Sequence, residues 1–210
     1  MKTLAGESER LTSASFAEQF WNLPNTITLL RVGAVPVLLL LPLMPGRSGS
    51  QLTAWVFILA AISDVVDGWL ARRGQQVTHI GKLLDPLADK LVISTALIVL
   101  LSMGRIPHWG VWMVVVIIGR ELAVTGLRGL ASAGGQVMAA SGLGKLKTLT
   151  QNIAIGALLF PDPTLQLPTR TLGLVLLGLA TLLTLWSGYV YFAQYFRALG
   201  SGAIAPKGDA

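Results

Sequence analysis

Apolar residues gather in six long stretches along most of the chain, separated by short polar segments. Each stretch approaches the roughly 20 residues that an α-helix needs to cross the hydrocarbon core of a bilayer. The pattern therefore predicts six membrane-spanning helices, at residues 26–45, 51–73, 84–104, 107–131, 144–161 and 170–197. The fifth is the weakest, because Lys145 and Lys147 open it and Pro161 closes it.

No internal repeat or low-complexity segment breaks this pattern, so we expect one all-α integral membrane domain at residues 26–198. Residues 1–25 would form an N-terminal interfacial segment and residues 199–210 a cytoplasmic tail. The first 20 residues are polar, and we expect no signal peptide. Phe16 and Phe20, one helical turn apart, favour a short amphipathic helix along the membrane surface. A loosely ordered tail accounts for the segment equally well.

Composition agrees with a membrane protein. With 53% hydrophobic and 12% charged residues, the chain is too apolar for an ordinary soluble domain. It has no cysteine, which excludes disulfides and thiolate metal sites. The formal net charge of +6 does not indicate nucleic-acid binding, because the basic residues are scattered among apolar segments. Anionic membrane lipids or anionic substrates explain the charge better.

Lysine and arginine are distributed unequally between the connecting segments on the two sides of the predicted membrane. In membrane proteins these residues are enriched on the cytoplasmic side. With both termini inside, three arginines would face outside: Arg47, Arg105 and Arg170. Ten basic residues would face inside: Lys2, Arg10, Arg72, Arg73, Lys82, Arg128, Lys145, Lys147, Arg197 and Lys207. Ten against three predicts that both termini are cytoplasmic.

Four aspartates, Asp64, Asp67, Asp85 and Asp89, lie inside or against the second and third predicted spans. Their spacing places each consecutive pair on one helix face. One ionised carboxylate near the bilayer centre costs about 2.5–3.5 kcal/mol. Hard divalent cations are the simplest compensation, and four carboxylates suit two Mg²⁺ or Mn²⁺ ions. Two other readings stay open: buried ion pairs with Arg31, Lys90 or Arg120, and an ion-coupled transporter.

The predicted topology brings most of the buried charge to one side. The aspartates fall in the cytoplasmic halves of their helices, and Arg31, Arg120 and Glu121 fall at the same level in neighbouring ones. Lys145 and Lys147 begin the fifth helix on that side. We therefore expect a single charged cavity that faces the cytoplasm.

The complete aspartate pattern resembles the signature of the CDP-alcohol phosphotransferases, membrane enzymes that join an alcohol to a CDP-activated group. Besides the four aspartates, the matching positions are Gly68, Ala71, Arg72 and Gly81. Eight matching positions across 26 residues make the resemblance specific. It implies the six-helix fold of this family and a site with two metal ions.

The resemblance also implies a role for each motif residue. Asp64, Asp67 and Asp85 would be metal ligands. Asp89 would be both a metal ligand and the base that deprotonates the acceptor hydroxyl. The residues that would line the CDP site are Gly68, Ala71 and Arg72, joined by Asn25, Thr28 and Arg31 from the first helix. Asn25 or Thr26 could instead merely cap that helix.

Basic residues in the fourth and fifth helices indicate the acceptor. Their segments resemble those of bacterial phosphatidylglycerophosphate synthases, a branch of this family. The residues that would bind the phosphate of glycerol 3-phosphate are Arg120, Arg128, Lys145 and Lys147, with Glu121 orienting one arginine. Arg128, Lys145 and Lys147 could instead be positive-inside anchors.

The resemblance thus implies transfer of the phosphatidyl group of CDP-diacylglycerol to glycerol 3-phosphate, with release of CMP, in a bacterial inner membrane. Cardiolipin-type and inositol-phosphate-using relatives stay open as alternatives. Family analogy suggests a homodimer. The last two helices carry little specific chemistry, and in the last one Gly173, Gly178 and Gly188 would allow close helix packing.

Overall fold

The computed structural model describes residues 23–44, 46–73, 79–133 and 142–200. Within these ranges it describes all side chains except those of residues 23–25, 64–73, 79–86 and 133. The predicted interfacial helix and nearly all of the predicted tail lie outside the described residues. The division into these three segments therefore stays a prediction.

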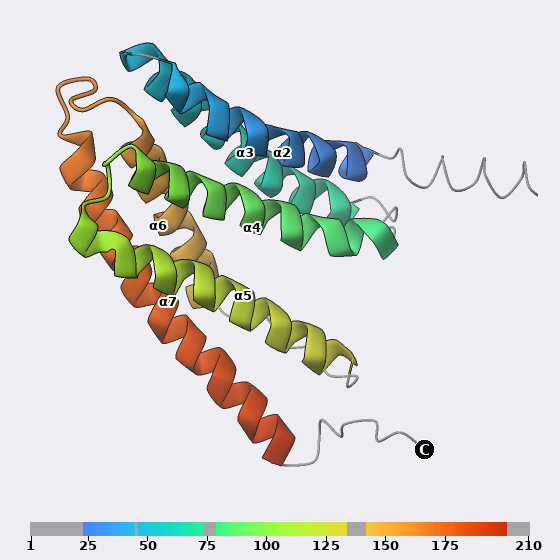
Figure 1. The fold of residues 1–210 in the computed structure, drawn as a ribbon. Coiled ribbons are helices and arrows are strands. Elements are labelled where there is room, and N and C mark those ends of the chain that lie inside the picture. Colours follow the sequence, from blue (N-terminus) through green and yellow to red (C-terminus); the bar gives the residue numbers. More distant parts are fainter. Residues whose placement is uncertain (1–22, 45, 74–78, 134–141, 201–210) are drawn as a thin grey trace, which may run out of the picture.

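Six α-helices account for almost all of the described residues, as the hydropathy pattern predicted (Figure 1). They are α2 (Leu23–Leu40), α3 (Arg47–Arg73), α4 (His79–Ser102), α5 (Val111–Ala133), α6 (Gly142–Leu159) and α7 (Thr169–Gly200). Short 3-10 turns follow α2 (η1, Leu41–Leu43) and precede α5 (η2, His108–Gly110). Helices α3 and α4 begin four or five residues before the predicted spans, because polar residues extend a helix without adding to its apolar stretch.

Three of the helical segments are long and apolar enough to cross a membrane when only the described residues are considered: Thr26–Leu43, His108–Ser132 and Thr169–Gly200. Helices α3 and α4 each contain residues whose side chains are outside the description. Helix α6 has two lysines, Lys145 and Lys147, in its first two turns. The helical fold is therefore confirmed, whereas the count of six spans stays a prediction.

The helices pack around one apolar core and turn other apolar side chains outward. Leu97 and Leu100 of α4, Ile117 of α5 and Leu177 of α7 are fully buried. Large apolar side chains such as Leu30, with 70% of its surface exposed, cover the outside. An apolar exterior is unfavourable in water but suits contact with lipid.

Close packing of α6 against α7 depends on a glycine. A methyl group at Gly173 would lie 2.6 Å from Cγ of Leu158, so only glycine allows the two helices this approach. The expected packing role is thus confirmed for Gly173. It is wrong for Gly178, where nothing lies within 4 Å of the same position.

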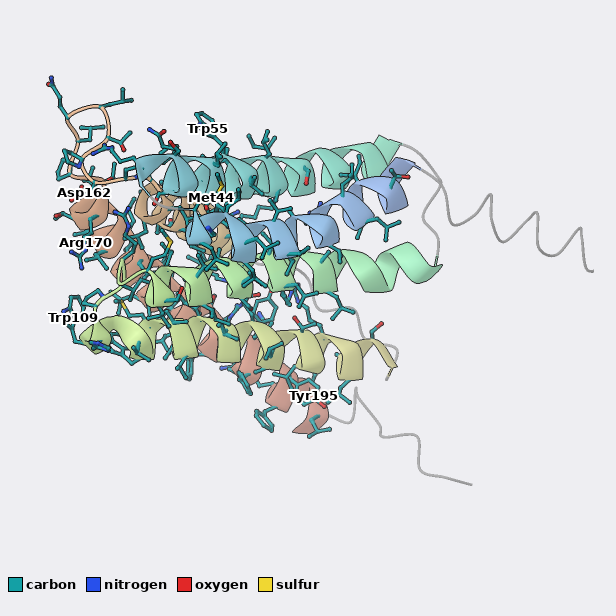
Figure 2. All side chains as sticks on the ribbon, turned by 45° about the horizontal axis from the view of Figure 1, so that its top comes forward. Met44, Trp55, Trp109, Asp162, Arg170 and Tyr195 are labelled. Atoms are coloured by element: carbon teal, nitrogen blue, oxygen red, sulfur yellow. The ribbon has the colours of Figure 1, made fainter. Side chains whose placement is uncertain are left out.

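The three arginines predicted to face outside lie close to the same connecting segments, and with Asp162 they form what we call the loop arginine network. Figure 2 shows Arg170 and Asp162 at one end of the bundle. Arg170 donates to the carbonyl oxygens of Gly104, at 3.1 Å, and Arg105, at 3.4 Å. Arg47 donates to the carbonyl oxygen of Pro163. The network therefore ties the start of α3, the α4–α5 connection and the α6–α7 connection together.

Candidate active site

The four aspartates lie on two helices that meet at the other end of the bundle (Figure 1). Asp64 and Asp67 belong to the second half of α3, which ends at Arg73. Asp85 and Asp89 belong to the first half of α4. The backbone thus brings both pairs to the same end, as the spacing and topology predicted.

Only one of the four aspartate side chains, that of the half-buried Asp89, belongs to the described set. The side chains of the predicted CDP-site residues Ala71, Arg72 and Asn25 also lie outside it, and at Gly68 and Gly81 only the helical backbone is described. Among the side chains that are described, no three acidic or histidine groups gather as a metal site. The metal ligands therefore stay a prediction.

Thr28 and Arg31 lie one turn apart on α2, and both side chains are buried. Arg31 Nε donates to Oγ of Ser63, at 3.5 Å, and Ser63 immediately precedes the aspartate motif in α3. A fully buried arginine inside an apolar helix requires partners. Its position links α2 to α3 where the motif begins, as a residue of the nucleotide site would.

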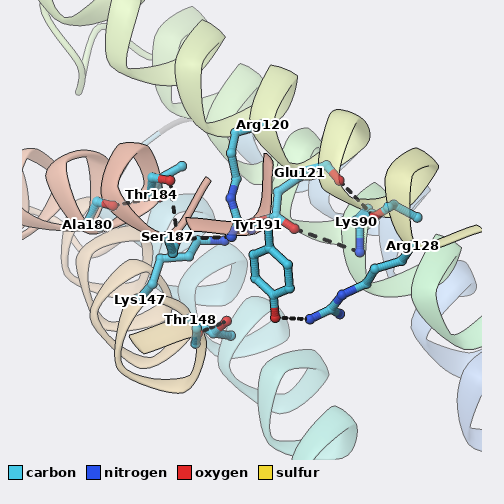
Figure 3. A network of polar contacts seen from close by, with 12 residues as sticks. Lys90, Arg120, Glu121, Arg128, Lys147, Thr148, Ala180, Thr184, Ser187 and Tyr191 are labelled. Atoms are coloured by element: carbon cyan, nitrogen blue, oxygen red, sulfur yellow. Dashed lines mark hydrogen bonds and ion pairs between the residues drawn. The ribbon is translucent and has the colours of Figure 1, made fainter. Parts of the chain in front are cut away.

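Four cations meet beside this motif, and we call them, together with Glu121 and Tyr191, the cationic cluster (Figure 3). The four are Lys90 from α4, Arg120 and Arg128 from α5, and Lys147 from α6. Three of them converge on the carboxylate of Glu121. Lys147 Nζ donates to Oε1, Arg120 Nη1 lies 3.4 Å from Oε1, and Lys90 Nζ lies 3.8 Å from Oε2.

Helix α7 completes the cluster with two hydroxyl groups. Arg120 Nη2 donates to Oγ of the buried Ser187, at 2.9 Å. Arg128 Nη2 donates to the hydroxyl of Tyr191. Both guanidinium groups also lie over the Tyr191 ring, at 5.5 Å for Arg120 and 4.7 Å for Arg128 from its centroid. Two arginines are thereby held in fixed orientations.

A glycine makes room for Arg120. A methyl group at Gly188 would lie only 3.1 Å from Cγ of Arg120, so the arginine side chain passes directly over the α7 backbone. The sequence interpretation gave Gly188 a role in helix packing. The structure confirms a close approach of α5 to α7 here, and shows that the neighbour is an arginine side chain of the cationic cluster.

Only one of the two lysines of α6 belongs to the cluster. Lys147 is buried, whereas Lys145 is exposed, because residues two apart on a helix point to nearly opposite sides. The structure thus brings together three of the four residues predicted for the acceptor, Arg120, Arg128 and Lys147. Lys90 of the cluster directly follows Asp89 in α4, so the cluster adjoins the aspartate motif.

The expectation that the last helix carries little specific chemistry is wrong. Ser187 and Tyr191 hold the two arginines of α5, and Lys90 is a member of the cluster that the acceptor prediction did not include. One signal was present in the sequence: Ser187 and Tyr191 are spaced i, i+4, so their hydroxyls share one face of an otherwise apolar helix.

Comparison with known proteins agrees with this geometry. Residues 21–186 match the family model described as CDP-alcohol phosphatidyltransferase. A CDP-diacylglycerol–glycerol-3-phosphate 3-phosphatidyltransferase of Bacillus subtilis (strain 168) is 42% identical over 85% of this chain and 97% of its own length. A probable phosphatidylglycerophosphate synthase of Mycobacterium tuberculosis (strain CDC 1551 / Oshkosh) is 42% identical over 85% and 84%. A relative in Pectobacterium atrosepticum with the same name as the Bacillus protein is 34% identical over 89% and 99%. The chain therefore belongs to the CDP-alcohol phosphatidyltransferase family.

Proposed function

We propose that the chain transfers the phosphatidyl group of CDP-diacylglycerol to glycerol 3-phosphate, giving phosphatidylglycerophosphate and CMP. The observation that carries this proposal is the cationic cluster. Three of its four cations contact a single carboxylate, that of Glu121, and the fourth, Arg128, donates to the hydroxyl of Tyr191. The relatives named for this reaction, which align along most of the chain, support the same acceptor.

Charge balance explains why the cluster suits a phosphate. Only 12% of the Arg120 side chain and 4% of the Lys147 side chain are exposed. Buried charges are costly unless they are paired, and Glu121 offsets one of the four cations. Asp89 directly precedes Lys90 in α4, but in this proposal it serves as the base. The phosphate dianion of glycerol 3-phosphate would offset most of the remaining positive charge, and the two arginines can bind its oxygens in pairs.

The donor would lie on the other side of Asp89. The buried Thr28 and Arg31 bring polar groups to the start of the aspartate motif, where CDP would bind together with Asn25, Gly68, Ala71 and Arg72. The two substrates would then meet at Asp89, with the acceptor hydroxyl next to its carboxylate. Positioning of this kind supplies much of the acceleration in phosphoryl transfer.

In the reaction, Asp89 takes the proton from the acceptor hydroxyl. The hydroxyl oxygen attacks the phosphorus that carries the diacylglycerol, and the bond from this phosphorus to the CMP oxygen breaks. The electron pair leaves with CMP. The cationic cluster holds the acceptor phosphate throughout, so that the hydroxyl stays in line with the bond that breaks.

Two divalent cations, Mg²⁺ or Mn²⁺, belong to this proposal. The oxygen donors that would hold them are Asp64, Asp67, Asp85 and Asp89, a set that fits hard cations and whose two helices meet at one end. When bound, the ions would neutralise charge on the diphosphate of the donor.

The proposed site faces the cytoplasm of a bacterial inner membrane, and the protein acts as a homodimer. The excess of basic residues at the segments next to the site supports this orientation. The bacterial relatives support the membrane. The dimer rests on family analogy alone.

The test is release of CMP by purified protein with each candidate acceptor, in the absence of any transmembrane gradient. We expect metal-dependent release with glycerol 3-phosphate. Release with phosphatidylglycerol or inositol phosphate, and none with glycerol 3-phosphate, would contradict the acceptor. A requirement for a gradient would favour an ion-coupled transporter instead.

The role of Asp89 is tested by Asp89→Asn, which should abolish turnover while CDP-diacylglycerol still binds. The matched control is Asp162→Asn, which changes a carboxylate at the opposite end of the bundle and should leave turnover unchanged. Normal turnover in Asp89→Asn would exclude this carboxylate as the base.

A further inference from the structure

An apolar groove of about 490 Å³ runs along the side of α2 that faces away from the core. Thr26, Leu30, Gly33 and Val37 line it at helical spacing, and Val56 of α3 closes its far end. Leu30 and Val37 are both exposed, as expected for a surface in contact with lipid. The groove is therefore open toward the bilayer.

The length of the groove matches one leaflet. From Thr26 to Val37 the helix rises through 11 residues, which is about 16 Å at 1.5 Å per residue. The hydrocarbon core of a bilayer is roughly 30 Å thick, so one leaflet contributes about 15 Å. A single lipid tail within one leaflet would occupy the groove from end to end.

The register of α2 against α3 places one end of the groove at the aspartate motif. Arg31 contacts Ser63, and Leu41 lies against Gly49, so the two helices run antiparallel with Arg31 and Ser63 level. Thr26 lies five residues before Arg31 in α2. By the same register it lies level with the α3 backbone near Gly68, inside the motif.

We propose that this groove holds one acyl chain of the diacyl donor while the diphosphate of the donor lies at the motif. The inference rests on the proposed function, since it takes CDP-diacylglycerol as the donor. The groove begins where the headgroup would bind and continues for the depth of one leaflet. A tail held there would fix the position of the phosphorus relative to Asp89.

Gly33 offers a direct way to close the groove. Nothing lies within 4 Å of the position that a Cβ would occupy at Gly33, so a larger residue fits there without a clash. Gly33 lies seven residues beyond Thr26, about 10 Å along the helix, which is deeper than a hexanoyl chain reaches. Gly178 of α7 is a matched control, because its Cβ position is equally open and it lies outside the groove.

The experiment compares Gly33→Leu and Gly178→Leu with the unmodified protein, using dipalmitoyl and dihexanoyl CDP-diacylglycerol. We expect kcat/KM for the dipalmitoyl donor to fall on the order of tenfold in Gly33→Leu, since a small misplacement of a bound substrate slows its reaction considerably. The dihexanoyl donor and the Gly178→Leu protein should stay within about twofold of their reference values.

A second variant, Val37→Trp, fills the groove at its deeper end and should show the same dependence on chain length. Equal losses for both donors in both variants, or no loss in either, would overturn the proposal. Displacement of labelled CDP-diacylglycerol by each donor, measured without an acceptor, gives the same comparison. The groove can therefore be tested even if glycerol 3-phosphate is not the acceptor.

Discussion

The two ends of the bundle use arginine in opposite ways. In the loop arginine network, Arg47 and Arg170 are exposed and donate to backbone carbonyl oxygens of neighbouring connections. In the cationic cluster, Arg120 is largely enclosed and Arg128 is exposed, and both donate to side chains of α7. Arginine thus connects loops by hydrogen bonds at one end of the bundle and forms part of a charged site at the other.

The two networks differ in the hydrogen-bond donors and the positive charge that their arginines can offer to a ligand. Burial is the main cause that lowers the pKa of Arg105 in the loop network; Asp162 opposes this shift, and Arg170 and Arg47 add to it. Arg47 and Arg170 are exposed, so water solvates the positive charge that Asp162 leaves unpaired. In the cationic cluster, the buried Nε of Arg120 has no hydrogen-bond partner among the described residues, and Glu121 serves three cations. The cluster therefore has a donor and positive charge available for a ligand.

The largest difference between the two ends should appear with Arg120→Ala, which removes one member of the cationic cluster. Removing one member of a buried charge network costs about 2–5 kcal/mol, so kcat/KM for glycerol 3-phosphate should fall on the order of 100-fold or more. The KM for CDP-diacylglycerol should change little, because Arg120 lies with the acceptor residues. Steady-state kinetics with each substrate varied in turn measures both. An equal rise in both KM values would show that Arg120 does not belong to the acceptor site.

A smaller effect is expected for Tyr191→Phe, which removes the hydroxyl that accepts from Arg128 but keeps the ring beneath both guanidinium groups. A hydrogen bond to a charged group contributes about 1.5–3 kcal/mol, so the KM for glycerol 3-phosphate should rise on the order of tenfold. The control is Tyr189→Phe on the same helix, where 70% of the side chain is exposed. Equal kinetics for the two variants would mean that the hydroxyl does not orient Arg128.

Gly188→Ala should have a smaller effect on the cationic cluster than Tyr191→Phe. The added methyl group would stand 3.1 Å from Cγ of Arg120, so the flexible arginine must shift by a few tenths of an ångström. We expect kcat/KM for glycerol 3-phosphate to fall about threefold, less than for loss of a hydrogen bond. Gly178→Ala, which meets open space, should have no effect. A loss of thermal stability without a kinetic change would instead indicate a role in helix packing.

Much of the fold could be predicted from sequence because lipid imposes a simple rule: each span needs a long apolar stretch. The rule finds the helices but not their ends, which is why α3 and α4 begin earlier than predicted. Within a helix, periodicity also places residues on faces. It could have separated Lys145 from Lys147, which are two residues apart.

Contacts between helices were harder to predict. The pairing of Arg120 with Ser187 and of Arg128 with Tyr191 joins residues more than 60 positions apart. No local pattern encodes such a contact, because it depends on how α5 and α7 pack. The sequence therefore predicted three of the four cations of the cluster, but neither Lys90 nor the hydroxyls that hold the arginines.

The smallest effect on activity should come from Arg170→Ala in the loop arginine network. Two bonds to carbonyl oxygens would be lost, but the freed carbonyls can bind water at this exposed end, so the stability cost is about 1 kcal/mol. For a chain of this size that corresponds to a decrease in Tm of about 2–4 °C. Turnover at a temperature well below Tm should be unchanged, since no substrate group reaches this end. A fall in kcat/KM for glycerol 3-phosphate without a change in Tm would mean that the loop arginine network contributes to substrate binding and not only to the stability of the fold.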